Sequence, residues 1–157
     1  MRATSIIVAL AIGAALSGLS ASAQESFSTE ILAEAPPEEL APPIREALGE
    51  EGIRVLDKNG KPFMDFWVRR SLPIQGEISE PARSILFPYL EVGELIGAVR
   101  LSEDAGDYKA QSILPGVYTM RYGLQPVDGD HLGISKFRDY LLLSFADEDM
   151  EREPITQ

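Results

Sequence analysis

The stretch GVYTMRYGLQPVDGDHLGISKFRD, from Gly116 to Asp139, contains a strand pattern on which the predicted fold depends and a loop whose residues suggest a function. In its first half apolar and polar side chains alternate, and Tyr118, Met120 and Tyr122 share one face. A period of two is typical of a β-strand with one buried face. The second half gathers three aspartates and the chain's only histidine into a loop before the next strand.

The same period of two runs through the sequence on either side of this stretch. GIRVLD and KPFMDFWVRR flank Asn59 and Gly60, a pair typical of a hairpin turn. Further strands are predicted in ARSILFPYL, GELIGAVRLS, DYKAQSIL and RDYLLLSFA. The last of these is apolar on both faces, which favours a central strand covered on both sides. About seven short strands with almost no helix predict an all-β fold, a two-sheet antiparallel β-sandwich over residues 52–146.

The run ILPGVYTMRYG resembles the Gly-x-Tyr strand start of immunoglobulin-like and transthyretin-like sandwiches. In those domains a tyrosine near the corner hydrogen-bonds back to the preceding connection. The resemblance implies that structural role for Tyr118, two residues after Gly116, and the place of a buried strand tryptophan for Trp67. The chain is also similar to small exported bacterial proteins of uncharacterised function that carry a PGVYT…DGDH…RD stretch. Neither resemblance implies an activity, because one fold hosts many functions.

The N-terminal sequence predicts export. Residues 1–23 combine Arg2, an apolar stretch shorter than the ~20 residues that span a bilayer, and a small-x-small site at Ala21–Ala23. These are the parts of a cleaved signal peptide. We therefore expect a periplasmic or secreted protein that does not insert into a membrane once the signal peptide is removed.

The segments that flank the predicted sandwich are charged. Residues 24–43 are acidic and rich in proline, which predicts a flexible leader. The sequence PPIREALGEEG predicts one short helix over residues 44–51. Residues 147–157 are predicted to form a frayed, charged tail.

Composition makes several classes of function improbable. The net charge of −11 without a basic stripe repels phosphate backbones and anionic lipid, so neither is expected as a partner. The lack of cysteine excludes disulfides, thiolate metal sites and cysteine nucleophiles. No glycine-rich phosphate loop or other cofactor motif is present, and no organic cofactor is expected.

The loop after the Gly116 strand could hold calcium. A calcium-loop pattern that starts with Asp128 at position 1 places Asp130 at position 3 and Asp139 at position 12. Hard cations take oxygen ligands at such spacing. However, Leu132 and Lys136 stand at two other ligand positions. The alternative is a plain turn in which aspartates accept hydrogen bonds from backbone amides.

His131 is a second candidate in the same loop. With Ser135 it could serve a hydrolase of unrecognised type, but no nucleophile-elbow motif accompanies the pair. The alternative is a loop histidine that hydrogen-bonds the backbone. Zinc would need more histidine or cysteine than the chain has.

Trp67 lies between Asp65 and Arg69 on its strand face. If this face is open, Trp67, Arg69 and His131 are candidate ligand-binding residues, with the indole stacking on a sugar or an apolar partner surface. If it is closed, Trp67 belongs to the core. The leading hypothesis is an exported, non-catalytic module that binds a protein partner or an envelope glycan. A calcium-binding module and a hydrolase are the alternatives, and the oligomeric state is left open.

Overall fold

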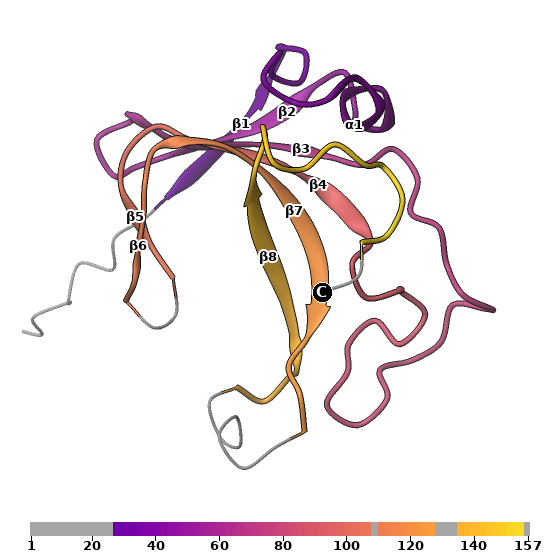
Figure 1. Cartoon of the computed structure of the whole chain (residues 1–157). Helices are drawn as coiled ribbons and strands as arrows, with labels where there is room; N and C mark the ends of the chain where they lie inside the picture. The colour runs from indigo at the N-terminus through magenta and orange to yellow at the C-terminus, as the bar shows by residue number, and fades with distance from the viewer. Residues whose placement is uncertain (1–26, 108–109, 128–134, 156–157) are drawn as a thin grey trace, which may run out of the picture.

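Six strands form one antiparallel sheet, in the order β1-β2-β3-β4-β7-β8 (Figure 1). The computed structural model describes residues 27–107, 110–127 and 135–155. The strands of this sheet are β1 (Ser28–Leu32), β2 (Gly52–Leu56), β3 (Pro62–Val68), β4 (Leu95–Leu101), β7 (Gly116–Leu124) and β8 (Asp139–Phe145). A small hairpin of β5 (Ala105–Gly106) and β6 (Ser112–Ile113) interrupts the connection from β4 to β7, and one helix, α1 (Pro42–Ala47), precedes β2.

The hairpin between β2 and β3 forms where the sequence predicts it. Gly60 has a φ of +77°, a conformation that side chains other than that of glycine rarely adopt. The carboxylate of Asp57 accepts hydrogen bonds from the backbone amides of Asn59 and Lys61, both at 2.8 Å. Local turn chemistry is therefore sufficient to place this hairpin.

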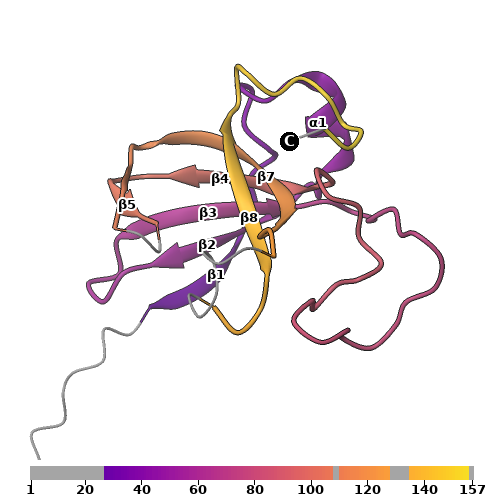
Figure 2. The same ribbon diagram turned by 60° about the horizontal axis from the view of Figure 1, so that its bottom comes forward.

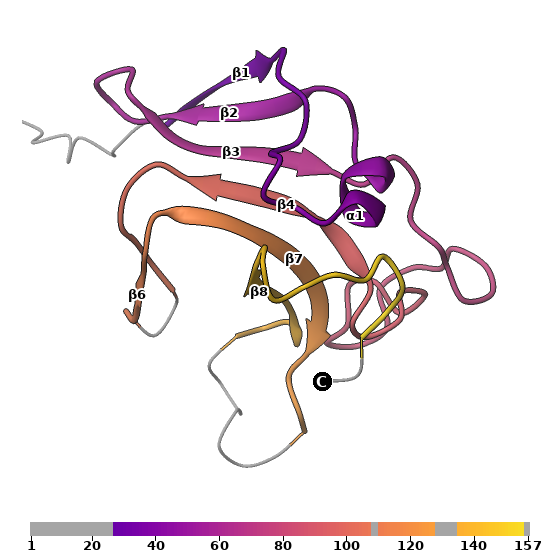
Figure 3. The same cartoon turned by 45° about the horizontal axis from the view of Figure 1, so that its top comes forward.

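The sheet is strongly curved, so that β7 and β8 turn away from the plane of β1 to β3 (Figures 1 and 3). Seen after rotation, β8 runs at a steep angle across β2 and β3 (Figure 2). One cause lies in β4, whose register against β7 shifts between Leu95 and Gly97. Such a bulge bends the strand and increases its twist. Gly97 suits this position because a Cβ atom there would lie 2.4 Å from the backbone oxygen of Trp67.

One face of the sheet, which we call the covered face, is overlaid by segments from both ends of the described chain. Residues 33–41 and α1 lie against it (Figure 3). Helix α1 is too short to be stable alone, and the complete burial of Ile44 holds it in place. The core on this face consists of Leu32, Leu40, Ala41, Ile44, Leu48, Trp67, Leu95, Ala98 and Ala146.

The prediction of a flexible leader over residues 24–43 is wrong for the part of that segment that the structure describes. Residues 28–32 form the edge strand β1, which pairs antiparallel with β2. Leu40 is fully buried, and the backbone oxygen of Glu34 accepts a hydrogen bond of 2.9 Å from the Trp67 indole. The segment has too few apolar residues to fold alone, but a sheet formed by later strands gives it a surface to pack on.

The prediction of a frayed tail over residues 147–157 is wrong for residues 147–155. Asp149 is buried, and its carboxylate forms an ion pair of 2.7 Å with Arg121. The amide of Ile155 donates a 3.3 Å hydrogen bond to the carbonyl of Gly93. The charged composition of this segment therefore provides an acidic partner for the buried Arg121, and does not indicate a solvated end.

Two strand predictions also need correction. ARSILFPYL, residues 82–90, forms an irregular connection with only an isolated bridge between Ala82 and Ile85, because Arg83 takes a positive φ and Pro88 lacks an amide donor. The strand β8 is at the edge of the sheet, not at its centre. Apolar residues on both faces of β8 suggested a central strand. Because β8 is an edge strand, its apolar residues must be explained by what lies beside that edge.

The predicted all-β, antiparallel class is confirmed: the regular secondary structure of the described chain is mostly strand, in one sheet of six strands and one of two. Within the described residues, no helix has the length and apolar character needed to cross a bilayer.

Candidate functional site

The face of the sheet opposite to the covered face carries a continuous set of apolar side chains, and we call it the open face. The strand register brings alternate residues of β3, β4, β7 and β8 to this face. Its central cluster consists of Met64, Phe66, Val99, Leu101, Tyr118, Met120 and Leu143, with Ala105 and Ile113 of the small hairpin packed beside them. Four of these side chains, those of Val99, Leu101, Tyr118 and Met120, are buried.

A groove of about 910 Å³ lies over the open face. Apolar side chains of β3, β4, β7 and β8 line it, and the β5–β6 hairpin and residues 125–126 border it. Small-molecule and peptide sites commonly have volumes of ~300–1,000 Å³ and mostly apolar walls with few polar groups. The polar residues at its border include Asp107, Gln111, Ser112 and Gln125. Size and lining therefore make this groove the candidate binding site.

The strand β8 contributes to the groove in an unusual way. Tyr140, Leu141, Leu142, Leu143 and Phe145 all line it. Side chains of consecutive strand residues point to opposite faces of a sheet. Consecutive residues can line one cavity when backbone atoms of the strand, and not only the side chains of one face, border that cavity. Backbone groups of the edge strand β8 therefore contribute to the border of the groove.

Apolar residues remain exposed around the groove. Leu141 is 50 % exposed and Phe145 is 47 % exposed, although both lie on the open face. On the same face, Ile53 of β2 is 40 % exposed and Ile31 of β1 is 70 % exposed. Large apolar side chains that stay exposed on one face of a folded chain are typical of a site of interaction.

Tyr118 anchors the end of the groove near the β5–β6 hairpin. Its hydroxyl donates a 2.8 Å hydrogen bond to the carbonyl of Leu114, in the connection that precedes β7. This is the kind of back-bond that the resemblance to immunoglobulin-like domains implies for this tyrosine. The Tyr118 ring also packs on Phe145, with 4.9 Å between ring centroids.

Asp139, the first residue of β8, ties the connection that precedes β4 to the sheet. Its carboxylate accepts hydrogen bonds from the Tyr122 hydroxyl at 2.7 Å and from the amides of Leu86 at 2.8 Å and Phe87 at 3.2 Å. Burial alone would raise the pKa of Asp139, but these donors outweigh it and hold the pKa below its usual value. Burial and the neighbouring carboxylate raise the pKa of Tyr122.

This network bears on the predicted calcium loop. The Asp139 carboxylate is already engaged by three donors, which matches the turn alternative rather than a cation ligand. Asp128 and Asp130, like His131, lie outside the described residues. In the described part of the chain, no three residues among histidine, aspartate and glutamate are grouped so as to hold a metal ion.

Trp67 belongs to the core of the covered face and is fully buried. An indole with no exposed surface offers no face to a sugar, so the alternative of an exposed Trp67 is wrong. Arg69 lies mostly buried and pairs with the buried carboxylate of Glu94. Burial raises the pKa of Glu94 despite the opposing charge of Arg69. Neither Trp67 nor Arg69 faces the groove.

Beside Trp67, the carboxylate of Asp65 is buried between two guanidinium groups. Arg54 contacts it at 2.7 Å and Arg100 at 2.6 Å. Burial would raise the pKa of Asp65, but the two arginines outweigh burial and lower it. Arg100 also lies over the Trp67 ring, 5.1 Å from its centroid, and pairs with Glu34. These contacts tie the segment before α1 to the sheet.

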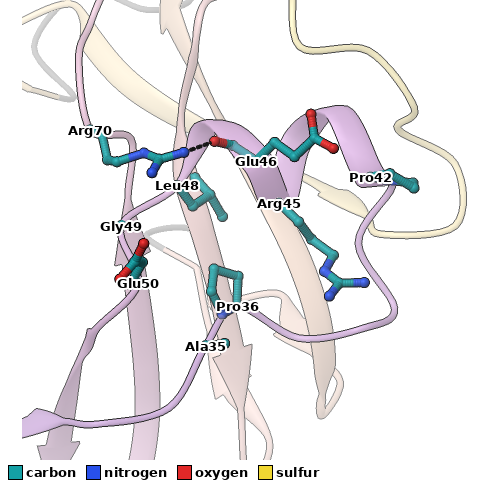
Figure 4. Close-up of a pocket in the computed structure, with 9 residues that line it drawn as sticks. All are labelled: Ala35, Pro36, Pro42, Arg45, Glu46, Leu48, Gly49, Glu50 and Arg70. Atoms are coloured by element: carbon teal, nitrogen blue, oxygen red, sulfur yellow. Dashed lines mark hydrogen bonds between the residues drawn. The ribbon is translucent and has the colours of Figure 1, made fainter.

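A second, smaller hollow of about 360 Å³ lies beside α1 (Figure 4). The Arg70 guanidinium donates to the backbone carbonyl of Glu46, near the C-terminal end of the helix. A cation at that position satisfies a carbonyl that the helix itself leaves unpaired. Arg70 is therefore explained by helix capping.

The groove is not predicted from the sequence if every apolar strand face is expected to be covered by a second sheet. The available signal was the run DYLLLSF, whose apolar residues on both sides fit a strand that borders a cavity with its edge. Comparisons of the chain with protein-family models, with curated proteins and with solved structures find no match.

Proposed function

We propose that the protein is a non-catalytic binding module whose apolar groove on the open face holds its ligand. The observation that carries this proposal is a groove of about 910 Å³ with apolar walls, which lies on the face of the sheet opposite to the covered face. Burial of apolar area at ~25 cal/mol per Å² makes such a surface a source of binding energy.

The groove favours an apolar partner over a glycan. Sugar sites rely on an exposed aromatic face flanked by hydrogen-bonding groups. The tryptophan that suggested such a site is buried on the other side of the sheet. The polar groups of the groove lie at its border, and its floor is formed by side chains such as Met64, Val99 and Met120.

Export and kinship with sandwich domains belong to this proposal as well. The N-terminal sequence supports an exported protein of the cell envelope. The back-bond from Tyr118 to Leu114 supports a relation to immunoglobulin-like or transthyretin-like sandwiches. A module of this kind would act by holding a partner, since the groove presents apolar contacts rather than reactive groups.

A titration with the neutral dye Nile red tests the groove. We expect its fluorescence to rise on addition of the folded chain, because the dye leaves water for an apolar site. In the variant Leu141→Lys the affinity should fall at least tenfold, since an ammonium group at the groove wall loses hydration when the dye covers it.

The variant Ile78→Lys is the matched control. Ile78 is 73 % exposed and does not line the groove. It adds the same charge to an apolar surface position and should leave dye binding unchanged. A wild-type chain that fails to bind the dye, or two variants with equal affinity, would rule out the groove as the binding site.

A further inference from the structure

The hydrogen-bond pattern of β8 determines which of its backbone groups face the groove. The amide of Gln125 donates to the carbonyl of Arg138, and the amide of Ala146 donates to the carbonyl of Val117. In an antiparallel ladder, residues that bond to the neighbour alternate with residues whose backbone groups point away. The even-numbered residues of β8 therefore bond to β7, and the backbone groups of Leu141 and Leu143 point outward.

The same residues place their side chains on the open face. Leu141 pairs with Tyr122 and Leu143 pairs with Met120, and both leucines line the groove. At this edge, backbone donors and acceptors thus stand next to an apolar wall. A purely apolar ligand that filled the groove would remove these backbone groups from water without giving them partners, at a cost comparable to that of a lost hydrogen bond.

An added strand has no such cost. A partner backbone placed beside β8 would exchange hydrogen bonds with Leu141 and Leu143, and its alternate side chains would enter the groove. Edge strands in stable monomers usually carry charges or proline that prevent such pairing. From Tyr140 to Ala146 the chain has neither.

We propose that the ligand of the groove is an extended peptide segment of another protein, which adds to β8 as a further strand of the sheet. This inference rests on the groove being the binding site. The segment is apolar at every second position, and its length is comparable to the seven residues of β8. A basic residue at one end suits the exposed Asp147 and Glu148 that follow β8 and the net charge of the chain.

The test uses the synthetic peptide KTVTVTVTK with a tetramethylrhodamine label and follows its fluorescence anisotropy on titration with the full chain. Two further peptides carry N-methyl groups, one on the three valines and the other on the four threonines. Because alternate residues of a strand direct their amides to opposite edges, each set of methyl groups blocks a different edge. One isomer should lose at least tenfold in affinity, and the other should stay within threefold of the parent peptide.

A matched pair of protein variants tests the same strand pairing by changing β8 instead of the peptide. Leu143→Pro removes an amide that β7 does not use, whereas Leu143→Ala keeps that amide and shortens the side chain. Peptide affinity should fall further in the proline variant than in the alanine variant. Far-ultraviolet circular dichroism shows whether both variants are folded.

Other outcomes overturn the inference in distinguishable ways. If Nile red binds but the peptide does not, or if both methylated isomers bind equally, the groove takes apolar molecules without strand pairing and only the peptide proposal is lost. If neither probe binds, the proposed function fails as well. A chain that sediments as a dimer which Leu143→Pro dissociates and the peptide does not would assign the edge to a second copy instead.

Discussion

The two faces of the six-stranded sheet have opposite chemistry. The covered face buries charges, since the carboxylates of Asp65 and Asp149 lie against arginines beneath segments from both ends of the chain. The open face has apolar residues, and several of them remain exposed, including Leu141 and Phe145. Buried charges and exposed large apolar side chains are both departures from the usual distribution. Exposed apolar side chains gathered on one face are typical of an interaction site.

This contrast separates what stabilises the fold from what binds the ligand. Each buried charge on the covered face has a specific partner, and removing one partner leaves the other desolvated. Removing an exposed apolar side chain from the open face leaves no buried charge without its partner. Substitutions on the covered face should therefore change the free energy of unfolding, while those on the open face should change binding.

The largest effect is expected at Asp149. The variant Asp149→Ala leaves the guanidinium of Arg121, which is fully buried, without its carboxylate. Breaking a buried pair in this way costs about 3–5 kcal/mol. Urea denaturation followed by circular dichroism measures the loss. The neighbouring Asp147 is exposed, so Asp147→Ala should change stability by less than about 0.5 kcal/mol. Equal midpoints for the two variants would refute a structural role for the tail.

The strands and the hairpin could be predicted from local sequence, but the covering segments could not. A period of two and the Asn59–Gly60 turn are local signals, and β2, β3, β4 and β7 form where these signals stand. The position of residues 33–41 and of the tail depends on long-range contacts, such as those of Glu34 with Trp67 and of Asp149 with Arg121. No pattern within those acidic segments indicates which distant residue they contact.

A second pair of variants compares one leucine from each face. Leu40→Ala removes a fully buried side chain from the core of the covered face and should cost about 2–4 kcal/mol, because a cavity remains. Leu141→Ala removes a half-exposed side chain from the groove and should cost less than about 1 kcal/mol. The difference between the two denaturation midpoints is the measurement. A smaller effect at Leu40 would mean that the segment before α1 is not part of the core.

The candidate site was less predictable than the fold. The sequence draws attention to residues with reactive or liganding side chains, such as Asp139 and Trp67, and both are used to hold the structure. The groove is made of ordinary apolar residues from four strands, and the edge of β8 contributes backbone groups that have no sequence signature. Only the register and curvature of the sheet bring these parts together.

The smallest effect is the acid dependence of the covered face. The pKa values of Asp65 and Asp149 are lower in the folded chain, because hydrogen bonds and arginine charges outweigh burial. Each therefore binds its proton more weakly when folded. Its contribution to stability is complete above the unfolded value of about 3.9 and is lost as the pH falls below that value toward the lower folded pKa. The loss should be smaller than that of Asp149→Ala, because a protonated carboxyl still occupies the space and accepts a hydrogen bond.

Glu94 acts in the opposite direction, since its pKa is raised by burial and its protonation favours the folded chain as the pH falls. The test is the free energy of unfolding measured from pH 7 to pH 3. It should decline mainly below about pH 4. In Asp149→Asn the decline should be shallower, because one of the groups with a lowered pKa is gone, while Asp147→Asn keeps the wild-type slope. Parallel curves for all three proteins would show that the carboxylate of Asp149 carries no linkage to folding.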